Sequence, residues 1–82
     1  MRLPRDVSGD ELVRRLRSFG YEPTRQTGSH LRLTSMSQGS EHHVTIPRHD
    51  ALRVGTLSAI LADVAGYLGV ERDELVRQLF AR

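Results

Sequence analysis

The sequence predicts an α+β fold, a two-layer sandwich in which helices cover one face of a three-stranded antiparallel sheet. Two observations support this prediction. Apolar residues recur at helical spacing near both ends of the 82-residue chain, and short segments between residues 21 and 46 alternate polar and apolar side chains. A run of strands flanked by helices is typical of this architecture, and the polar face of such a sheet stays open to solvent.

The first helix is expected over residues 9–19. Ser8-Gly9-Asp10-Glu11 has the pattern of a capping box, in which Ser8 caps the helix and the Glu11 side chain bonds back to it. Apolar side chains follow at helical spacing, and arginines occupy the other side. The apolar residues are Leu12, Val13, Leu16 and Phe19, and the arginines are Arg14, Arg15 and Arg17. Gly20 is a typical helix end.

Three short strands are expected in the middle of the chain. They span residues 21–27, 30–35 and 42–46. Pro23 weakens the start of the first strand, Gly28-Ser29 forms a tight turn or bulge, and polar residues 35–41 form a hairpin loop. Alternation along the strands separates a core face from an open face. The core face carries Leu31, Leu33, Val44 and Ile46, and the open face carries His30, Arg32, Thr34, His43 and Thr45.

Two further helices are expected after a connector at residues 47–54. The first begins at Gly55-Thr56 with Thr56 as its cap and ends at Gly69, and the second covers residues 71–81. Their apolar stripes are Leu57, Ile60, Leu61, Val64 and Leu68, then Leu75, Val76, Leu79 and Phe80. We expect these stripes, and both phenylalanines of the chain, to be buried in the core.

Composition limits the class of protein. Residues 1–82 are few enough to form a single domain, and the chain has no cysteine for a disulfide or a thiolate zinc site. No apolar stretch is long enough to span a bilayer or to act as a secretory signal, so a soluble cytoplasmic protein is expected. All 12 basic residues are arginine, and nine of them lie in residues 1–53 against six acids. This balance mildly favours a nucleic-acid or phosphate partner.

The Gly28-Ser29-His30 step is the strongest chemical feature of the sequence. The turn leads directly into the second strand, so His30 is expected on rigid backbone, facing outward beside Arg32 and Thr34. Imidazole is the side chain that exchanges protons most readily near neutral pH. A guanidinium and a hydroxyl next to it make this face suitable for acid–base chemistry on a phosphate ester.

Three segments of the chain together resemble one known family. They are Arg25-Gln26-Thr27-Gly28-Ser29-His30, Val44-Thr45-Ile46-Pro47, and Gly55-Thr56-Leu57 with Ile60-Leu61. In this order and at these separations they resemble the HicA, or YcfA-like, toxins of bacterial and archaeal toxin–antitoxin operons, over about residues 12–80. The resemblance implies a fold like the double-stranded-RNA-binding domain, α-β-β-β-α, here with an additional C-terminal helix. It also implies a small ribonuclease that cuts messenger RNA, with His30 as catalytic histidine, and a HicB-type antitoxin that blocks this histidine.

Further candidate residues follow from their expected positions. Candidates for phosphate or RNA contacts are Arg25, Gly28, Ser29, Arg32, Gly55 and Thr56. Arg32 shares the face of His30, whereas Gly55-Thr56 lies at a helix N-terminus, where free N–H groups attract phosphate. Arg14, Arg15 and Arg17 offer a supporting RNA contact from the first helix, although such side chains commonly form a solvated helix face.

The other histidines suggest weaker hypotheses. His43 lies on the face of His30 one strand over and is a candidate second acid or base, the alternative being a surface histidine. His42 is expected to point to the opposite face, and His49 lies in the connector with no expected role. The histidines lack the spacing of a metal site, so the sequence predicts neither metal nor cofactor.

The expected reaction is therefore metal-independent cleavage of RNA, in which His30 acts as base or acid and a 2′,3′-cyclic phosphate is left. The alternative is a non-catalytic module that binds RNA or a protein through the same polar face. Because the core is small, formation of a homodimer or binding of the antitoxin can stabilise the fold further.

Overall fold

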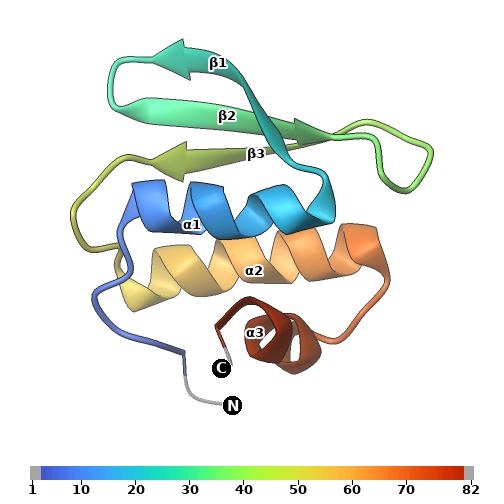
Figure 1. The fold of residues 1–82 in the computed structure, drawn as a ribbon. Coiled ribbons are helices and arrows are strands. Elements are labelled where there is room, and N and C mark those ends of the chain that lie inside the picture. The colour runs from blue at the N-terminus through green and yellow to red at the C-terminus, as the bar shows by residue number, and fades with distance from the viewer. Residues whose placement is uncertain (1–2, 81–82) are drawn as a thin grey trace.

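The computed structural model describes residues 3–80 and has the expected order of elements (Figure 1). The elements are α1 (Gly9–Leu16), the 3₁₀ turn η1 (Arg17–Phe19), β1 (Glu22–Thr27), β2 (His30–Ser35), β3 (His42–Pro47), α2 (Val54–Leu68) and α3 (Arg72–Phe80). The predicted α+β class and the α-β-β-β-α layout with an additional C-terminal helix are confirmed. The end of the last predicted helix at Ala81 lies outside the described residues.

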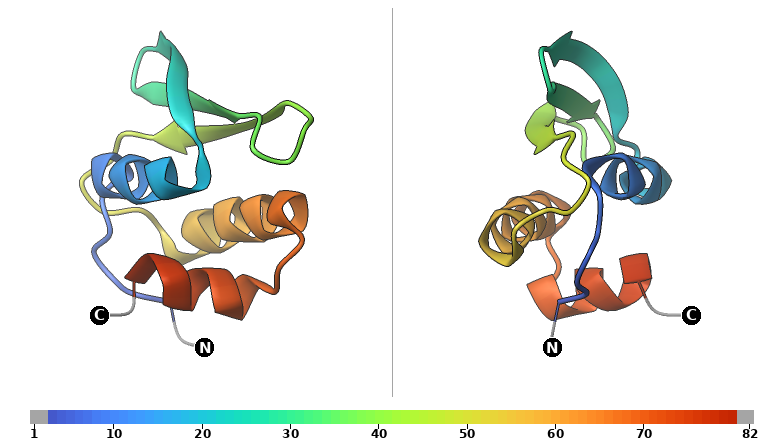
Figure 2. Two further views of the ribbon diagram at one scale, coloured as in Figure 1. Left: turned by 45° about the vertical axis from the view of Figure 1, so that its right-hand side comes forward. Right: turned by 90° about the vertical axis from the view of Figure 1, so that its left-hand side faces the viewer.

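The sheet forms one layer and the helices lie beneath it (Figure 2). Its strands follow the order β1-β2-β3, with both pairings antiparallel. Helices α1 and α2 pack under the sheet, whereas α3 packs on the side of α2 that faces away from the sheet and makes an angle of 105° with it. The additional helix thus supports α2 and leaves the far face of the sheet uncovered.

The register of the strands fixes which side chains share a face. Leu31 pairs with Ile46 and Leu33 pairs with Val44, so these apolar residues face the helices as predicted. Every residue of β1 is exposed, and a bulge interrupts its pairing between Pro23 and Arg25. Proline cannot donate to the ladder, and a bulge is a usual place for it in a strand.

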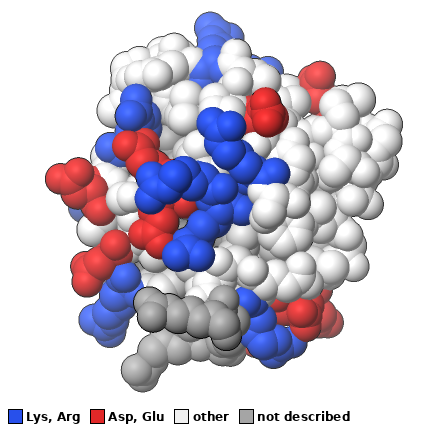
Figure 3. Space-filling model, in the orientation of Figure 1, with Lys and Arg blue, Asp and Glu red and all other residues white. Residues whose placement is uncertain are grey.

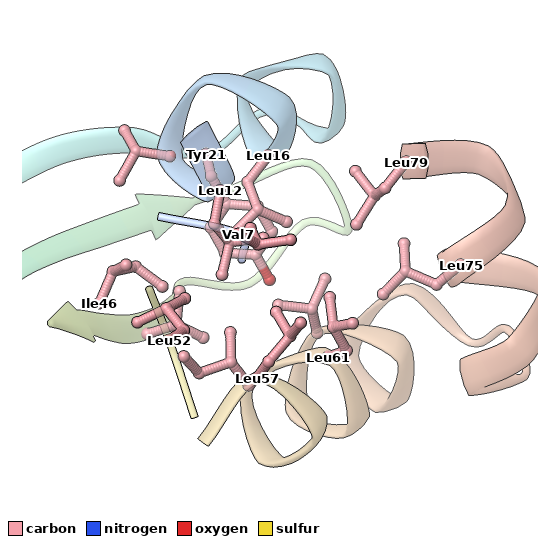
Figure 4. Packing of buried hydrophobic residues seen from close by; sticks show 14 of the residues in the cluster. Val7, Leu12, Leu16, Tyr21, Ile46, Leu52, Leu57, Leu61, Leu75 and Leu79 are labelled. Atoms are coloured by element: carbon pink, nitrogen blue, oxygen red, sulfur yellow. The ribbon is translucent and has the colours of Figure 1, made fainter. Parts of the chain in front are cut away.

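The core lies between the sheet and the helices and is built mainly from leucine, isoleucine and valine (Figure 4). Leu12 and Leu16 of α1 and Leu61 of α2 are fully buried. The N-terminal segment also joins this core through Leu3 and Val7, which the sequence pattern does not predict. Burying each such side chain contributes about 1.5–3 kcal/mol.

The burial of the aromatic residues differs from the prediction. Phe19 and Phe80 are only partly buried and pack against the edge of the core, whereas Tyr21 is completely buried. Phe19 lies in the 3₁₀ turn at the end of α1, and the guanidinium carbon of Arg15 lies 5.0 Å above the ring of Phe80. Tyr21 immediately precedes β1, under the sheet, and there it replaces the phenylalanines as the buried aromatic residue.

The helix starts confirm one capping prediction and correct another. The Ser8 hydroxyl accepts a hydrogen bond from the Glu11 N–H at 3.0 Å, as predicted, but the Glu11 carboxylate pairs with Arg15 at 2.9 Å. Helix α2 begins at Val54 and is capped by Arg53, so the prediction of Thr56 as its cap is wrong. Arg53 has extended backbone and its carbonyl already accepts the first helical bond, from Leu57 at 2.9 Å. Thr56 therefore lies inside the first turn.

No single helix of the described residues has the length and hydropathy of a membrane span. The bent pair formed by α2 and α3 passes the same test by length and composition only.

Candidate functional site

The uncovered face of the sheet carries a shallow hollow of about 180 Å³ around His30. We call it the His30 hollow, and it is lined by Arg25, Thr27, His30, Arg32 and Thr45. All three strands contribute, and His30 itself is exposed at the first residue of β2. Two guanidinium groups, two hydroxyls and one imidazole thus converge on one concave surface. Such a set can bind an anion and exchange protons with it.

The turn before His30 is held in place by main-chain hydrogen bonds. Gly28 has a φ of 58°, a left-handed conformation that glycine adopts without a steric penalty. The carbonyl of Ser29 accepts a hydrogen bond from the N–H of Arg48 at 2.7 Å, just past the end of β3. The connector after β3 is fastened to the N-terminal segment in turn, because the Gly9 N–H donates to the His49 carbonyl at 3.0 Å and the Leu52 N–H to the Val7 carbonyl at 2.7 Å.

The Arg48 side chain adds a second fastening, to Asp10 at the start of α1. Its Nε lies 2.9 Å from Oδ1 of Asp10 and its Nη2 lies 3.3 Å from Oδ2. The hydrogen bond from Arg48 lowers the pKa of the Asp10 carboxyl below its ordinary value of 3.8. The connector that supports the Ser29 turn is therefore joined to α1 by both main-chain and ionic contacts.

We expect Asp10→Asn to lower the stability of the fold slightly at neutral pH and to have no effect in strong acid. The carboxyl has a lower pKa in the folded chain than in the unfolded chain, so its ionised form stabilises the fold above pH 3.8. That contribution is lost as the pH falls through the lowered pKa. Urea unfolding at low salt, at neutral pH and in strong acid, measures the difference, and Asp50→Asn in the same connector is the control. An equal effect of Asp10→Asn at both pH values would contradict this assignment.

His43 lies on the same uncovered face, in a second hollow of about 290 Å³ that adjoins the first. Its Nδ1 lies 2.7 Å from the Thr34 hydroxyl, its Nε2 lies 2.7 Å from the Glu41 carboxylate, and the Arg32 guanidinium contacts both ring nitrogens at 3.4 Å. The pairing places His43 opposite Thr34, four residues along β2 from His30, and strands rise about 3.3 Å per residue. The two histidines are thus about 13 Å apart along the strand, too far to bond to one phosphate group.

His42 points to the opposite face, as alternation predicts, and belongs to a cluster of ring side chains. Its Nδ1 lies 2.7 Å from the Tyr21 hydroxyl and its Nε2 lies 3.1 Å from Asp63. The Tyr67 ring stacks on it at 4.6 Å, with 10° between the planes. Burial raises the pKa of Tyr21 far above its ordinary value, so this hydroxyl stays protonated. When Nε2 of His42 donates to Asp63, Nδ1 is left as an acceptor for the Tyr21 hydroxyl.

The same cluster anchors the hairpin loop between β2 and β3. The Tyr67 hydroxyl accepts a hydrogen bond from the Gln38 N–H at 3.0 Å and donates to the Ser40 carbonyl. Buried Ser35 donates to the Phe19 carbonyl at 3.3 Å at the start of the loop. Sequence reasoning missed this arrangement, since its members lie far apart in the chain. The only sequence signal was the core-facing position of His42.

The structure does not bring the other candidate residues into the His30 hollow. Gly55 and Thr56 lie in the first turn of α2, within the helical layer, and line neither hollow. His49 is exposed in the connector. The arginines of the first helix are exposed as well, and Figure 3 shows basic side chains gathered over α1 among acidic ones. Within residues 3–80, no group of three or more histidine, aspartate or glutamate side chains is placed to hold a metal ion.

Comparison with known families decides which class of protein this arrangement belongs to. The family model described as the HicA toxin of bacterial toxin–antitoxin systems matches residues 9–65. The chain belongs to the HicA toxin family. The match covers α1, the whole sheet and most of α2, and therefore every residue that lines the two hollows. As a HicA toxin the chain has a cognate antitoxin as its partner. Searches of curated proteins and of solved structures found no match.

Proposed function

We propose that this HicA toxin is a metal-independent endoribonuclease that cleaves messenger RNA in the His30 hollow. The observation that carries the proposal is the convergence of His30, Arg25 and Arg32 on one open concave surface. The imidazole is accessible to a large substrate, and its strand is fastened at Ser29. Cleavage of RNA needs few other groups, because each ribose carries its own nucleophile, the 2′-hydroxyl.

In the proposed reaction the 2′-hydroxyl of a ribose attacks the adjacent phosphorus atom, and the bond from phosphorus to the 5′-oxygen of the next nucleotide breaks. One fragment ends in a 2′,3′-cyclic phosphate and the other begins with a 5′-hydroxyl. His30 takes the proton from the 2′-hydroxyl or gives one to the leaving 5′-oxygen, and a water molecule carries out the other of these two proton transfers. Arg25 and Arg32 stabilise the negative charge on the phosphate oxygens in the transition state. Thr27 and Thr45 offer hydroxyls to the same oxygens.

The remaining contacts are proposed to position the RNA. Gly28 and Ser29 form the turn directly before His30 and line neither hollow, so their proposed contact is with a phosphate beside the one that is cleaved. Gly55 and Thr56 lie outside the hollow, so we assign them at most a contact with a distant part of the strand, through the N-terminus of α2. The cognate antitoxin is proposed to be of the HicB type and to act by covering the His30 hollow.

Cleavage of RNA but not of DNA is the expected result that tests this function. Purified protein is incubated in EDTA with an RNA oligonucleotide and with the deoxyribose version of the same sequence. We expect the RNA to be cut and the DNA to stay intact, because only RNA has the 2′-hydroxyl nucleophile. The 5′ fragments should end in a 2′,3′-cyclic phosphate. Cutting of both strands, loss of RNA cleavage in EDTA, or binding of RNA without cleavage would contradict the proposal, and the last would favour a non-catalytic binding module.

A further inference from the structure

The second hollow on the uncovered face has no part in the proton transfer proposed above. It is lined by Thr24, Arg25, Arg32, Thr34, Glu41 and His43, and we call it the Glu41 hollow. It shares Arg25 and Arg32 with the His30 hollow, so the two form one continuous depression with the arginine pair in the middle. The bulge after Pro23 lets Thr24 as well as Arg25 contribute to it. A strand of RNA that runs from His30 along this depression passes over it.

The Glu41 hollow differs from the His30 hollow in containing an acid. Glu41 is the only acidic residue among the linings of the two hollows. A carboxylate repels a phosphate group, so the part of the depression at Glu41 is less suited to the RNA backbone than the part at His30. A carboxylate beside a guanidinium instead matches a neutral group that carries both donors and acceptors. The Watson–Crick edge of an unpaired nucleobase is such a group, and single-stranded RNA is commonly recognised through it.

A chain of hydrogen bonds holds the carboxylate in place. Glu41 accepts from Nε2 of His43 at 2.7 Å, Nδ1 of His43 lies 2.7 Å from the Thr34 hydroxyl, and that hydroxyl lies 2.8 Å from the Thr24 hydroxyl. The loop that carries Glu41 is anchored by Tyr67 at Ser40. A carboxylate has about four lone-pair sites, of which His43 uses one, so it can still accept two bonds from a ligand. His43 thus acts as a positioning residue for Glu41.

We propose that the Glu41 hollow is a nucleobase subsite that selects guanine next to the scissile phosphate. Guanine carries two neighbouring donors, N1–H and the N2 amino group, which match the free lone pairs of Glu41. Its O6 is an acceptor for Arg25 or Arg32. Adenine presents an acceptor at N1 where guanine presents a donor, so it would place two acceptors against each other. This inference rests on the proposed function for its RNA substrate.

Binding of oligonucleotides that cannot be cleaved tests the subsite separately from catalysis. The probes are fluorescent 2′-O-methyl pentanucleotides of uridine with a single guanosine or a single adenosine at the centre, and fluorescence anisotropy gives their affinities. We expect the wild-type chain to bind the guanosine probe about tenfold more tightly, as one bidentate base contact allows. Glu41→Gln should abolish this preference, since an amide cannot accept two bonds from the same edge. Glu71→Gln removes the same charge at the start of α3 and should keep the preference.

Three outcomes would overturn the subsite. They are equal binding of both probes by the wild-type chain, no measurable binding of either, and a preference that persists in Glu41→Gln. Failure of the proposed function would give a different result. The wild-type chain would then leave ordinary RNA uncut, whether or not it prefers the guanosine probe. A wild-type chain that cuts RNA equally well with and without guanine would rule out the guanine subsite but not the proposed ribonuclease function.

Discussion

We expect His30→Ala to slow the cleavage of RNA by a factor of about 10²–10⁴, the usual contribution of one general acid–base group. The imidazole is the only side chain in the His30 hollow that exchanges protons readily near neutral pH. The arginines and hydroxyls remain, so RNA should still bind with little loss of affinity. The measurement is single-turnover cleavage of a labelled oligonucleotide, accompanied by growth of cells in which each variant is induced.

The matched control is His49→Ala, which removes an exposed imidazole from the connector and should leave the cleavage rate unchanged. His30 is exposed too, and substitutions of this kind usually alter stability by less than about 0.5 kcal/mol. Thermal unfolding of both variants should therefore match that of the wild-type chain. A His30→Ala chain that still cuts RNA at more than a tenth of the normal rate, and still arrests growth, would remove His30 from the mechanism.

The second large effect is expected at Gly9, where α1 begins. A Cβ at this position would lie 2.0 Å from the carbonyl oxygen of Pro47 and 3.0 Å from Cα of Arg48, both of them main-chain atoms. Neither can move without shifting the end of β3 away from α1. The displacement would also strain the bond from the Gly9 N–H to the His49 carbonyl. We expect Gly9→Ala to lower the free energy of unfolding by about 3 kcal/mol or more, the upper end of what overpacking usually costs.

Gly66→Ala is the control for this substitution. Gly66 is exposed inside α2, and nothing lies within 4 Å of a Cβ built there. Alanine is favoured over glycine by about 1 kcal/mol in a helix interior, so this variant should be more stable than the wild-type chain. Glycine is replaced by alanine at both sites. The two changes in the free energy of unfolding should have opposite signs, mainly because the added Cβ is crowded at position 9 and not at position 66. Urea unfolding measures both, and a Gly9→Ala chain within 1 kcal/mol of wild type would show that α1 and β3 are less tightly packed than described.

Local patterns predicted much of this molecule. Alternation in β2 and β3 placed Leu33 and Ile46 in the core and His30 on the open face, because a strand with one buried face allows only one register. The cap at Ser8 was also predictable, since its bond spans only three residues. The family resemblance rested on the same short segments.

What the sequence did not predict depends on contacts between distant segments. The stacking of His42 on Tyr67, and its bond to Tyr21, join residues more than twenty positions apart. The position of Thr24 in the Glu41 hollow depends on a bulge that Pro23 alone does not specify. Threonine is a residue type that often caps a helix, which is why the sequence predicts a cap at Thr56, whereas the extended backbone at Arg53 decides where α2 starts.

The connector after β3 holds the turn before His30 through main-chain hydrogen bonds, to which the Arg48 side chain adds its ion pair with Asp10. The bonds from Arg48 to Ser29 and from Gly9 to His49 join main-chain atoms, and residues 48–51 are exposed. The side chains at positions 49–51 can therefore change, and with them the surface presented beside the turn, while the shape of the turn is retained. Proline at position 48 is the exception, because it has no N–H to offer Ser29.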